Sequence, residues 1–110
     1  MLATKMESIV HPVNLLVDME YERAKMMYGG TFANAHEGFG VIAEEVQEAA
    51  EEAEKAIDLL SPMLRAIRAG DKTKIVDKAY MIRDRAVNAA AEMIQVAAMC
   101  EKLVKTMEDA

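Results

Sequence analysis

The sequence predicts an all-α protein, organised as a bundle of about four helices that is completed by homo-oligomerisation. Alanine, glutamate, lysine and methionine, all good helix formers, dominate the composition. Only two prolines and five glycines interrupt the chain, and 53% of the residues are apolar. Aromatic residues make up 5%, with no tryptophan, which disfavours a β-sandwich. A length of 110 residues fits a single domain over residues 1–110.

The first helix is expected from about Thr4 to Met27. Pro12 should bend this helix or mark its true start, because proline cannot donate a backbone hydrogen bond. Tyr28, Gly29 and Gly30 should end it, since glycine readily adopts the left-handed conformation that closes a helix. Apolar residues recur along it at helical spacing: Ile9, Val13, Leu16 and Val17.

The second helix is expected from Ala35 to about Leu60. Asn34 is a favourable N-cap residue, and Glu37 follows at the spacing of a capping box. An apolar stripe with a period near 3.6 residues runs along this helix, formed by Ile42, Val46, Ala49, Ala53, Ile57 and Leu60.

Two further helices follow. Ser61 and Pro62 read either as an N-cap with proline at the first helical position or as a kink. A short helix from Met63 to Ala69 should stop at Gly70. The last helix should start near Asp71 and run to about Met107. Its centre, residues 87–99, is apolar almost all round, which predicts a central place in the bundle, helped by a partner subunit.

The charge is concentrated in one segment. Residues 37–58 contain eight acidic residues and one basic residue, a net charge of −7, within a chain of net charge −6. Such a segment repels phosphate backbones, so we expect no nucleic-acid partner for this face. The same segment should attract divalent cations.

The sequence also predicts a cytoplasmic protein without a membrane partner. The single cysteine, Cys100, allows no internal disulfide and fits a reducing compartment. The first residues include polar side chains, so no signal peptide is expected. No apolar run approaches the ~20 residues that a membrane-spanning helix needs.

Two polar rows stand out beside the apolar surfaces of the second and fourth predicted helices. On the second helix, Glu45, Glu48 and Glu52 border the apolar stripe, whereas the other acidic side chains point to solvent. On the fourth helix, three polar side chains lie one above the next: Asn88, Glu92 and Gln95.

These rows allow two interpretations. If the two helices pack antiparallel, Glu45, Glu48 and Glu92 converge, and converging carboxylates need a cation between them. Oxygen ligands of this kind suit Mg²⁺ or Mn²⁺. Alternatively, the glutamate run is a solvated helix face, Glu92 is paired with an arginine, and the amides cross-link helices by hydrogen bonds.

The segments His36–Glu48 and Ala89–Met99 resemble the MazG-like superfamily of all-α nucleoside triphosphate pyrophosphohydrolases, and are similar to its small phage-associated and gut-bacterial members. That family carries E-x-x-E on one helix and E-x-x-D on a second. Here the first motif is intact at Glu45 and Glu48. The second begins at Glu92 but has Gln95 where the family has aspartate.

The resemblance implies a specific activity. Such proteins hydrolyse a (deoxy)nucleoside triphosphate to the monophosphate and pyrophosphate with Mg²⁺, and they assemble as homodimers or homotetramers. The implied metal ligands are Glu45, Glu48 and Glu92, with Gln95 at the fourth position as a neutral ligand. Glu45 and Glu48 are the implied catalytic residues.

Further residues are candidates for the same site. Glu52, one turn beyond Glu48, is a candidate additional ligand or base. Arg85 is a candidate phosphate contact or a partner that neutralises the acidic helix, and Asn88 is a candidate substrate contact. Three aromatic residues around the loop before the acidic helix are candidates for stacking on a base or, alternatively, for packing: Phe39, Phe32 and Tyr28. The alternative function is a catalytically silent helical dimer with a nucleotide-binding, structural or regulatory role.

Overall fold

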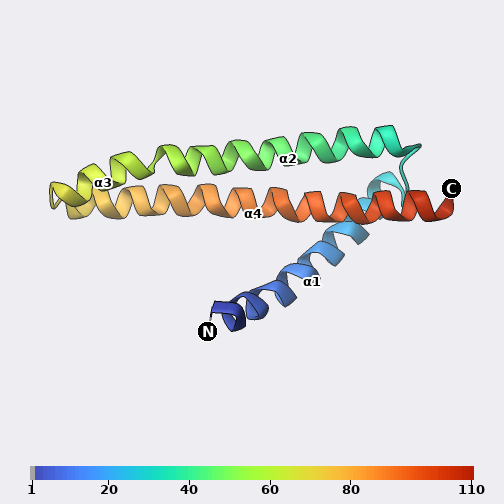
Figure 1. Ribbon diagram of the computed structural model, residues 1–110, viewed down its shortest axis with the longest axis horizontal. Helices are drawn as coiled ribbons and strands as arrows, with labels where there is room; N and C mark the ends of the chain where they lie inside the picture. The colour runs from blue at the N-terminus through green and yellow to red at the C-terminus, as the bar shows by residue number, and fades with distance from the viewer. Residues whose placement is uncertain (1) are drawn as a thin grey trace. The chain divides into compact units, whose positions relative to one another are not determined.

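The computed structural model describes the backbone of residues 2–110 and the side chains of residues 8–110. Within that range it contains helices and no strand, so the all-α prediction is confirmed for the described chain. The helices are α1 (Leu2–Tyr28), α2 (Ala35–Asp58), α3 (Leu60–Arg68) and α4 (Lys72–Asp109) (Figure 1).

The chain divides into two compact units. Unit 1 contains the residues up to Glu45 together with Met93–Ala110, and unit 2 contains Val46–Glu92. The N-terminal part of α2 and the C-terminal half of α4 therefore belong to unit 1, which also includes α1. The remainder of α2, all of α3 and the first half of α4 make up unit 2.

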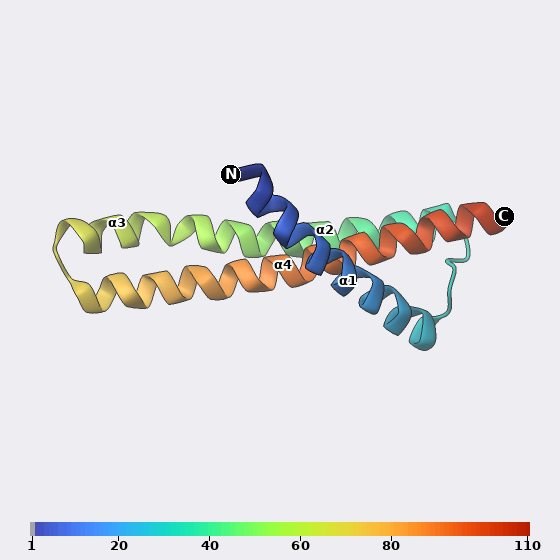
Figure 2. The same cartoon turned by 90° about the horizontal axis from the view of Figure 1, so that it is seen from below.

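In unit 1, α1 runs obliquely to the C-terminal half of α4 (Figure 2). Pro12 lies inside this helix. The predicted end is confirmed: Gly29 has a φ of 89°, and its N–H donates to the Lys25 carbonyl at 2.9 Å. The chain then folds back over the last turns of α4, where the Phe32 N–H donates to Thr106 Oγ1 at 2.8 Å.

The start of α2 is capped as predicted. The Glu37 N–H donates to Asn34 Oδ1 at 2.9 Å. The carboxylate of Glu37 accepts a hydrogen bond from the Ala33 N–H at 3.5 Å, whereas in a capping box it would accept one from the N-cap residue. The cap fixes the direction in which α2 leaves the loop.

The core of unit 1 combines small aliphatic side chains with an aromatic ring. The buried apolar residues are Val17, Ala24, Phe32 and Ala98. Gly38 of α2 allows a close approach, because a Cβ at this position would lie 2.9 Å from Phe32 Cδ2. The ring of Phe32 is therefore held in the space between the loop, α2 and α4.

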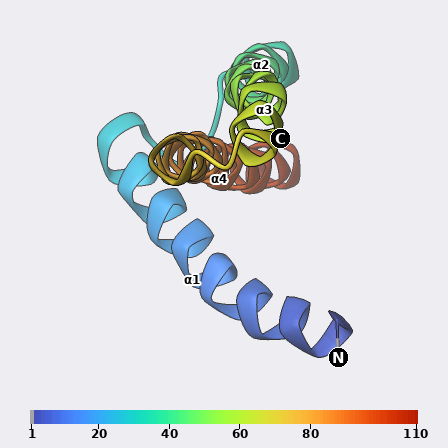
Figure 3. The ribbon, with the colours of Figure 1, turned by 90° about the vertical axis from the view of Figure 1, so that its left-hand side faces the viewer.

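Unit 2 is a helical hairpin, in which α3 and the end of α2 lie antiparallel to the first half of α4 (Figures 1 and 3). Of the two readings of Ser61 and Pro62, the N-cap at Ser61 is wrong, and the alternative of a kink fits the structure. The interruption lies at Leu59, whose side chain makes no capping hydrogen bond, and α3 already includes Pro62. Because Pro62 has no N–H to donate to the turn before it, the helix is interrupted just upstream and then resumes.

The turn between α3 and α4 also lies in unit 2. Gly70 has a φ of 66°, its N–H donates to the Ile67 carbonyl, and the Asp71 N–H donates to the Ala66 carbonyl. This is the Schellman arrangement that the predicted glycine stop implies. Asp71 then caps α4 by accepting a hydrogen bond from the Lys74 N–H at 3.1 Å.

The centre of α4 is not covered on every side by this chain. Val87 and Met93 are each about half exposed. The expectation that residues 87–99 are buried on all faces therefore does not hold for a single copy. Among the described residues, no helix is long and apolar enough to cross a membrane.

Candidate metal centre

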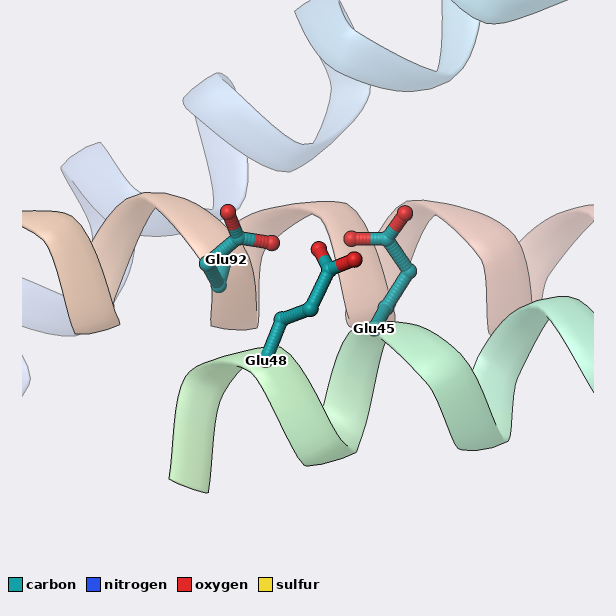
Figure 4. Close-up of side chains that lie close together, drawn as sticks. All are labelled: Glu45, Glu48 and Glu92. Atoms are coloured by element: carbon teal, nitrogen blue, oxygen red, sulfur yellow. The ribbon is translucent and has the colours of Figure 1, made fainter. Parts of the chain in front are cut away.

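Three carboxylates converge between α2 and α4. Glu45 and Glu48 lie one turn apart on the same face of α2, because residues three apart are neighbours on a helix. Glu92 reaches them from α4, and each of the three offers a carboxylate oxygen within 4.8 Å of the other two. Figure 4 shows the three carboxylates turned toward one another. The convergence expected from antiparallel packing is thus present.

The chemistry of this cluster fits a hard divalent cation. All three donors are carboxylate oxygens, the ligand type that Mg²⁺ and Mn²⁺ prefer. Oxygen ligands lie about 2.1 Å from Mg²⁺ and therefore at most about 4.2 Å from one another. A spacing of up to 4.8 Å is close to that limit, and rotation of flexible glutamate side chains can close the difference.

The polar row of α4 divides into two parts. Glu92 and Gln95 are partly buried, and Gln95 lines a cavity that Glu45 also lines. Asn88, one turn before Glu92, is exposed. Gln95 therefore lies near one of the clustered carboxylates, as its motif position requires, while Asn88 faces solvent.

Glu52 and Arg85 pair with each other inside unit 2. Arg85 Nη1 donates to Glu52 Oε2 at 3.3 Å, and Lys55 Nζ lies 3.5 Å from Glu52 Oε1. Burial would raise the pKa of the Glu52 carboxyl, but the hydrogen bond from Arg85 and the charges of Lys55 and Arg85 outweigh it and hold this pKa below its usual value. Arg85 thus offsets part of the negative charge of α2.

A cavity of about 470 Å³ lies in unit 1. Residues from α1, the following loop, α2 and α4 line it, among them Arg23, Tyr28, Phe32, Glu45, Gln95 and Lys102. Its volume falls within the range of small-molecule sites. Phe39, one of the candidate stacking residues, is 69% exposed and does not line this cavity, whereas Tyr28 and Phe32 do.

The charges on the α1 wall of the cavity neutralise one another. Arg23 donates to Glu20 through Nε at 2.9 Å and through Nη2, so the two side chains form a bidentate pair. This hydrogen bond lowers the pKa of the Glu20 carboxyl, partly opposed by burial. The same pairing raises the pKa of Arg23.

Two buried polar residues in unit 1 were not identified from the sequence. Lys102 is only 6% exposed and Thr106 only 8%. From the sequence, both residues would be placed at the solvent-exposed end of a helix, because no neighbouring residue indicates that the loop before α2 covers them. One signal was available: an isolated glycine inside a predicted helix, here Gly38, often marks a close approach of another segment.

Comparison with known proteins finds no matching family model, no matching curated protein and no matching solved structure.

Proposed function

We propose that this protein is a Mg²⁺-dependent hydrolase that converts a (deoxy)nucleoside triphosphate to the monophosphate and pyrophosphate. The observation that carries the proposal is the convergence of Glu45, Glu48 and Glu92, which come from the two motif segments that resemble MazG-like enzymes. The cavity that Glu45 and Gln95 line offers space for a ligand next to these carboxylates.

In this proposal Glu45, Glu48 and Glu92 hold the divalent cation, and Gln95 supplies a neutral amide oxygen at the fourth motif position. When bound, such a cation offsets the negative charge of phosphate oxygens and lowers the pKa of a coordinated water. The carboxylates fix the position of that charge on two helices. A glutamine cannot accept a proton, so the proton of the attacking water must go to one of the carboxylates or to bulk solvent.

The role of Glu52 as an additional ligand or base stays a prediction. Its pKa is held low by Arg85 and Lys55, which keeps the carboxylate ionised near neutral pH but weakens it as a base. Replacing Glu52 with glutamine tests the role directly. Unchanged Mg²⁺ affinity together with unchanged turnover would exclude it.

We also propose that a second copy completes the bundle, as a homodimer or as half of a homotetramer. Apolar side chains at helical spacing on α1 remain exposed in the single chain: Ile9, Val13 and Leu16. Leucine and isoleucine side chains in such a row are normally covered in a stable protein. Light scattering after size exclusion should give a mass of at least two chains, and a monomeric mass at micromolar concentration would contradict this part of the proposal.

The activity is tested with purified protein, each NTP and dNTP in turn, and Mg²⁺ or Mn²⁺, by measuring pyrophosphate release. We expect release with at least one nucleotide, and a loss of at least a hundredfold for Glu92→Gln. The matched control is Glu51→Gln, which removes an exposed carboxylate from the solvent face of α2 and should retain activity.

Absence of release with every nucleotide would favour the alternative, a catalytically silent helical dimer with a binding or regulatory role. Release that persists unchanged in Glu92→Gln would show that the activity does not depend on the carboxylate cluster. Cleavage that releases orthophosphate instead of pyrophosphate would show that the protein is a phosphatase and not a pyrophosphohydrolase.

A further inference from the structure

Lys102 is the basic residue in unit 1 whose surroundings differ most from those of a surface lysine. Only 6% of the residue is exposed, and its Nζ lies 4.5 Å from the centroid of the Phe32 ring. Among the described residues, no ion pair includes Lys102, whereas Arg23 pairs with Glu20 and Lys105 with Asp109. Since no buried side-chain nitrogen of the described residues lacks a hydrogen-bond partner, the Lys102 ammonium is not sealed off but remains accessible.

The ammonium of Lys102 belongs to the wall of the unit 1 cavity. The acidic residues on the same wall are already engaged. Glu20 is held by Arg23, and Glu37 accepts a hydrogen bond at the start of α2. Glu45 belongs to the carboxylate cluster. With Glu20 and Arg23 paired, Lys102 adds a positive charge to its end of a lining that also holds the acidic residues Glu37 and Glu45.

The surrounding structure fixes this lysine in advance. The Phe32 N–H donates to Thr106 Oγ1, and the Thr106 hydroxyl donates to the Lys102 carbonyl, both at 2.8 Å. The Phe32 ring also lies against Gly38, where an added Cβ would be 2.9 Å from Phe32 Cδ2. A buried lysine beside an aromatic ring that is held in place loses little conformational entropy when it binds an anion.

The length of the cavity indicates what kind of anion fits. Gln95 and Lys102 both line it, and they lie seven residues apart on α4, about 10 Å along the helix axis. Glu45 lines the cavity together with Gln95. A single phosphate cannot contact both ends, whereas a chain of linked phosphates can reach from a cation at Glu45 toward Lys102.

We infer that Lys102 binds the terminal phosphate of a polyphosphate chain that lies along the unit 1 cavity. The inference rests on the proposed function in one respect, namely that the other end of the phosphate chain contacts the metal. The positive end of the cavity and the fixed lysine stand independently of that assignment. Binding at Lys102 orients the chain so that an inner phosphate is nearest the carboxylate cluster.

The test uses inorganic triphosphate as the probe and isothermal calorimetry as the measurement, first with EDTA present and then with Mg²⁺. Wild-type protein should bind triphosphate without metal, at least tenfold more tightly than orthophosphate, and the affinity should fall as salt is raised. Lys102→Met keeps the unbranched stem and removes the charge, and should weaken triphosphate binding at least tenfold. Lys105→Met, at an exposed ion pair on the same helix, should change it less than twofold.

A second measurement guards against a folding defect in the variant. Backbone amide shifts of the wild-type protein, titrated with triphosphate in EDTA, should move around Tyr28–Phe32 and Met99–Thr106. Shifts confined to unit 2, or triphosphate affinity that is unchanged in a folded Lys102→Met variant, would overturn the inference. Absence of triphosphate binding by the wild type, with or without Mg²⁺, would also overturn it.

These outcomes can be separated from those of the proposed function. If triphosphate binds through Lys102 but no nucleotide releases pyrophosphate, the inference stands and the enzyme proposal fails. If pyrophosphate is released with unchanged kcat and KM in Lys102→Met, the enzyme proposal stands and the inference fails. A nucleoside triphosphate that binds more tightly than inorganic triphosphate identifies a nucleotide as the source of the chain; equal affinity identifies the phosphate chain alone.

Discussion

Thr106, near the end of α4, accepts a hydrogen bond at 2.8 Å from the backbone N–H of Phe32, 74 residues earlier in the chain. The same hydroxyl donates to the Lys102 carbonyl one turn back. A single side chain therefore joins the loop before α2 to the last turns of α4. It also sets the position of the aromatic ring beside the Lys102 ammonium.

Thr106→Val should destabilise the protein by about 1–3 kcal/mol, because an isosteric methyl leaves the buried Phe32 N–H without an acceptor. The measurement is urea unfolding followed by circular dichroism. Thr73→Val, at an exposed position in the first turn of α4, is the control and should change the free energy of unfolding by less than about 0.5 kcal/mol. Equal effects of the two variants would show that the loop contact contributes nothing specific.

Two glycines of α2 should respond in opposite directions to alanine. At Gly38 a Cβ would lie 2.8 Å from Leu103 Cδ1 and 2.9 Å from Phe32 Cδ2, so overpacking should cost about 1–3 kcal/mol. At Gly40 nothing lies within 4 Å of the added Cβ, so Gly40→Ala should stabilise the helix by about 0.5–1 kcal/mol. Thermal unfolding of both variants checks the signs. A stabilising Gly38→Ala would mean that the Phe32 ring is not confined as described.

Glu52 should make the stability depend on pH in the acidic range. Burial would raise the pKa of its carboxyl, but Arg85 and Lys55 lower it below the unfolded value of 4.5, so the folded state binds this proton less readily. The stabilisation is therefore fully present above pH 4.5 and is lost as the pH falls through the lowered folded pKa. The difference in unfolding free energy between wild type and Glu52→Gln should shrink across that window.

The control for this titration is Glu51→Gln, which also removes one acid from α2 but at an exposed position. It reports how much of any change comes from lowering the charge of an acidic helix. A difference between wild type and Glu52→Gln that stays constant from neutral pH to below pH 4 would contradict the ion-pair account.

Much of the fold could be predicted from local signals. The Asn34 cap, the Gly29 and Gly70 stops and the Asp71 cap follow from short-range backbone chemistry, and all are present. The serine–proline pair at Ser61 and Pro62 allowed two readings, a helix start or a kink, and the helix start is wrong. The interruption actually falls at Leu59, where the missing Pro62 donor weakens the preceding turn.

In the candidate site, too, the features that depend on local sequence could be predicted and those that depend on distant segments could not. The meeting of Glu48 and Glu92 could be predicted, because it needs only helical periodicity and antiparallel packing. The burial of Lys102 could not be predicted, because it depends on the position of the loop before α2, far earlier in the chain. The charged residues around Lys102 in the sequence also suggested a solvent-exposed segment. For the same reason the sequence could not rank Phe39 against Tyr28 and Phe32, and it is the last two that line the cavity.

Gln95→Asp should convert the second motif to the form that MazG-like enzymes carry. Without metal, a further carboxylate near Glu45 adds repulsion and should lower the melting temperature in EDTA. With Mg²⁺ the added charge should tighten metal binding by about tenfold, or about 1.4 kcal/mol. The melting temperature should therefore rise more on Mg²⁺ addition in Gln95→Asp than in wild type. An identical response of the two proteins would place residue 95 outside the metal site.

The central claim is that Glu45, Glu48 and Glu92 hold one divalent cation, and calorimetric titration with Mn²⁺ tests it most directly. We expect saturable binding of Mn²⁺ to the wild type, weakened at least tenfold in both Glu48→Gln and Glu92→Gln, and unchanged in Glu51→Gln. No heat of binding at millimolar Mn²⁺, or equal affinity in the wild type and the two cluster variants, would contradict the claim.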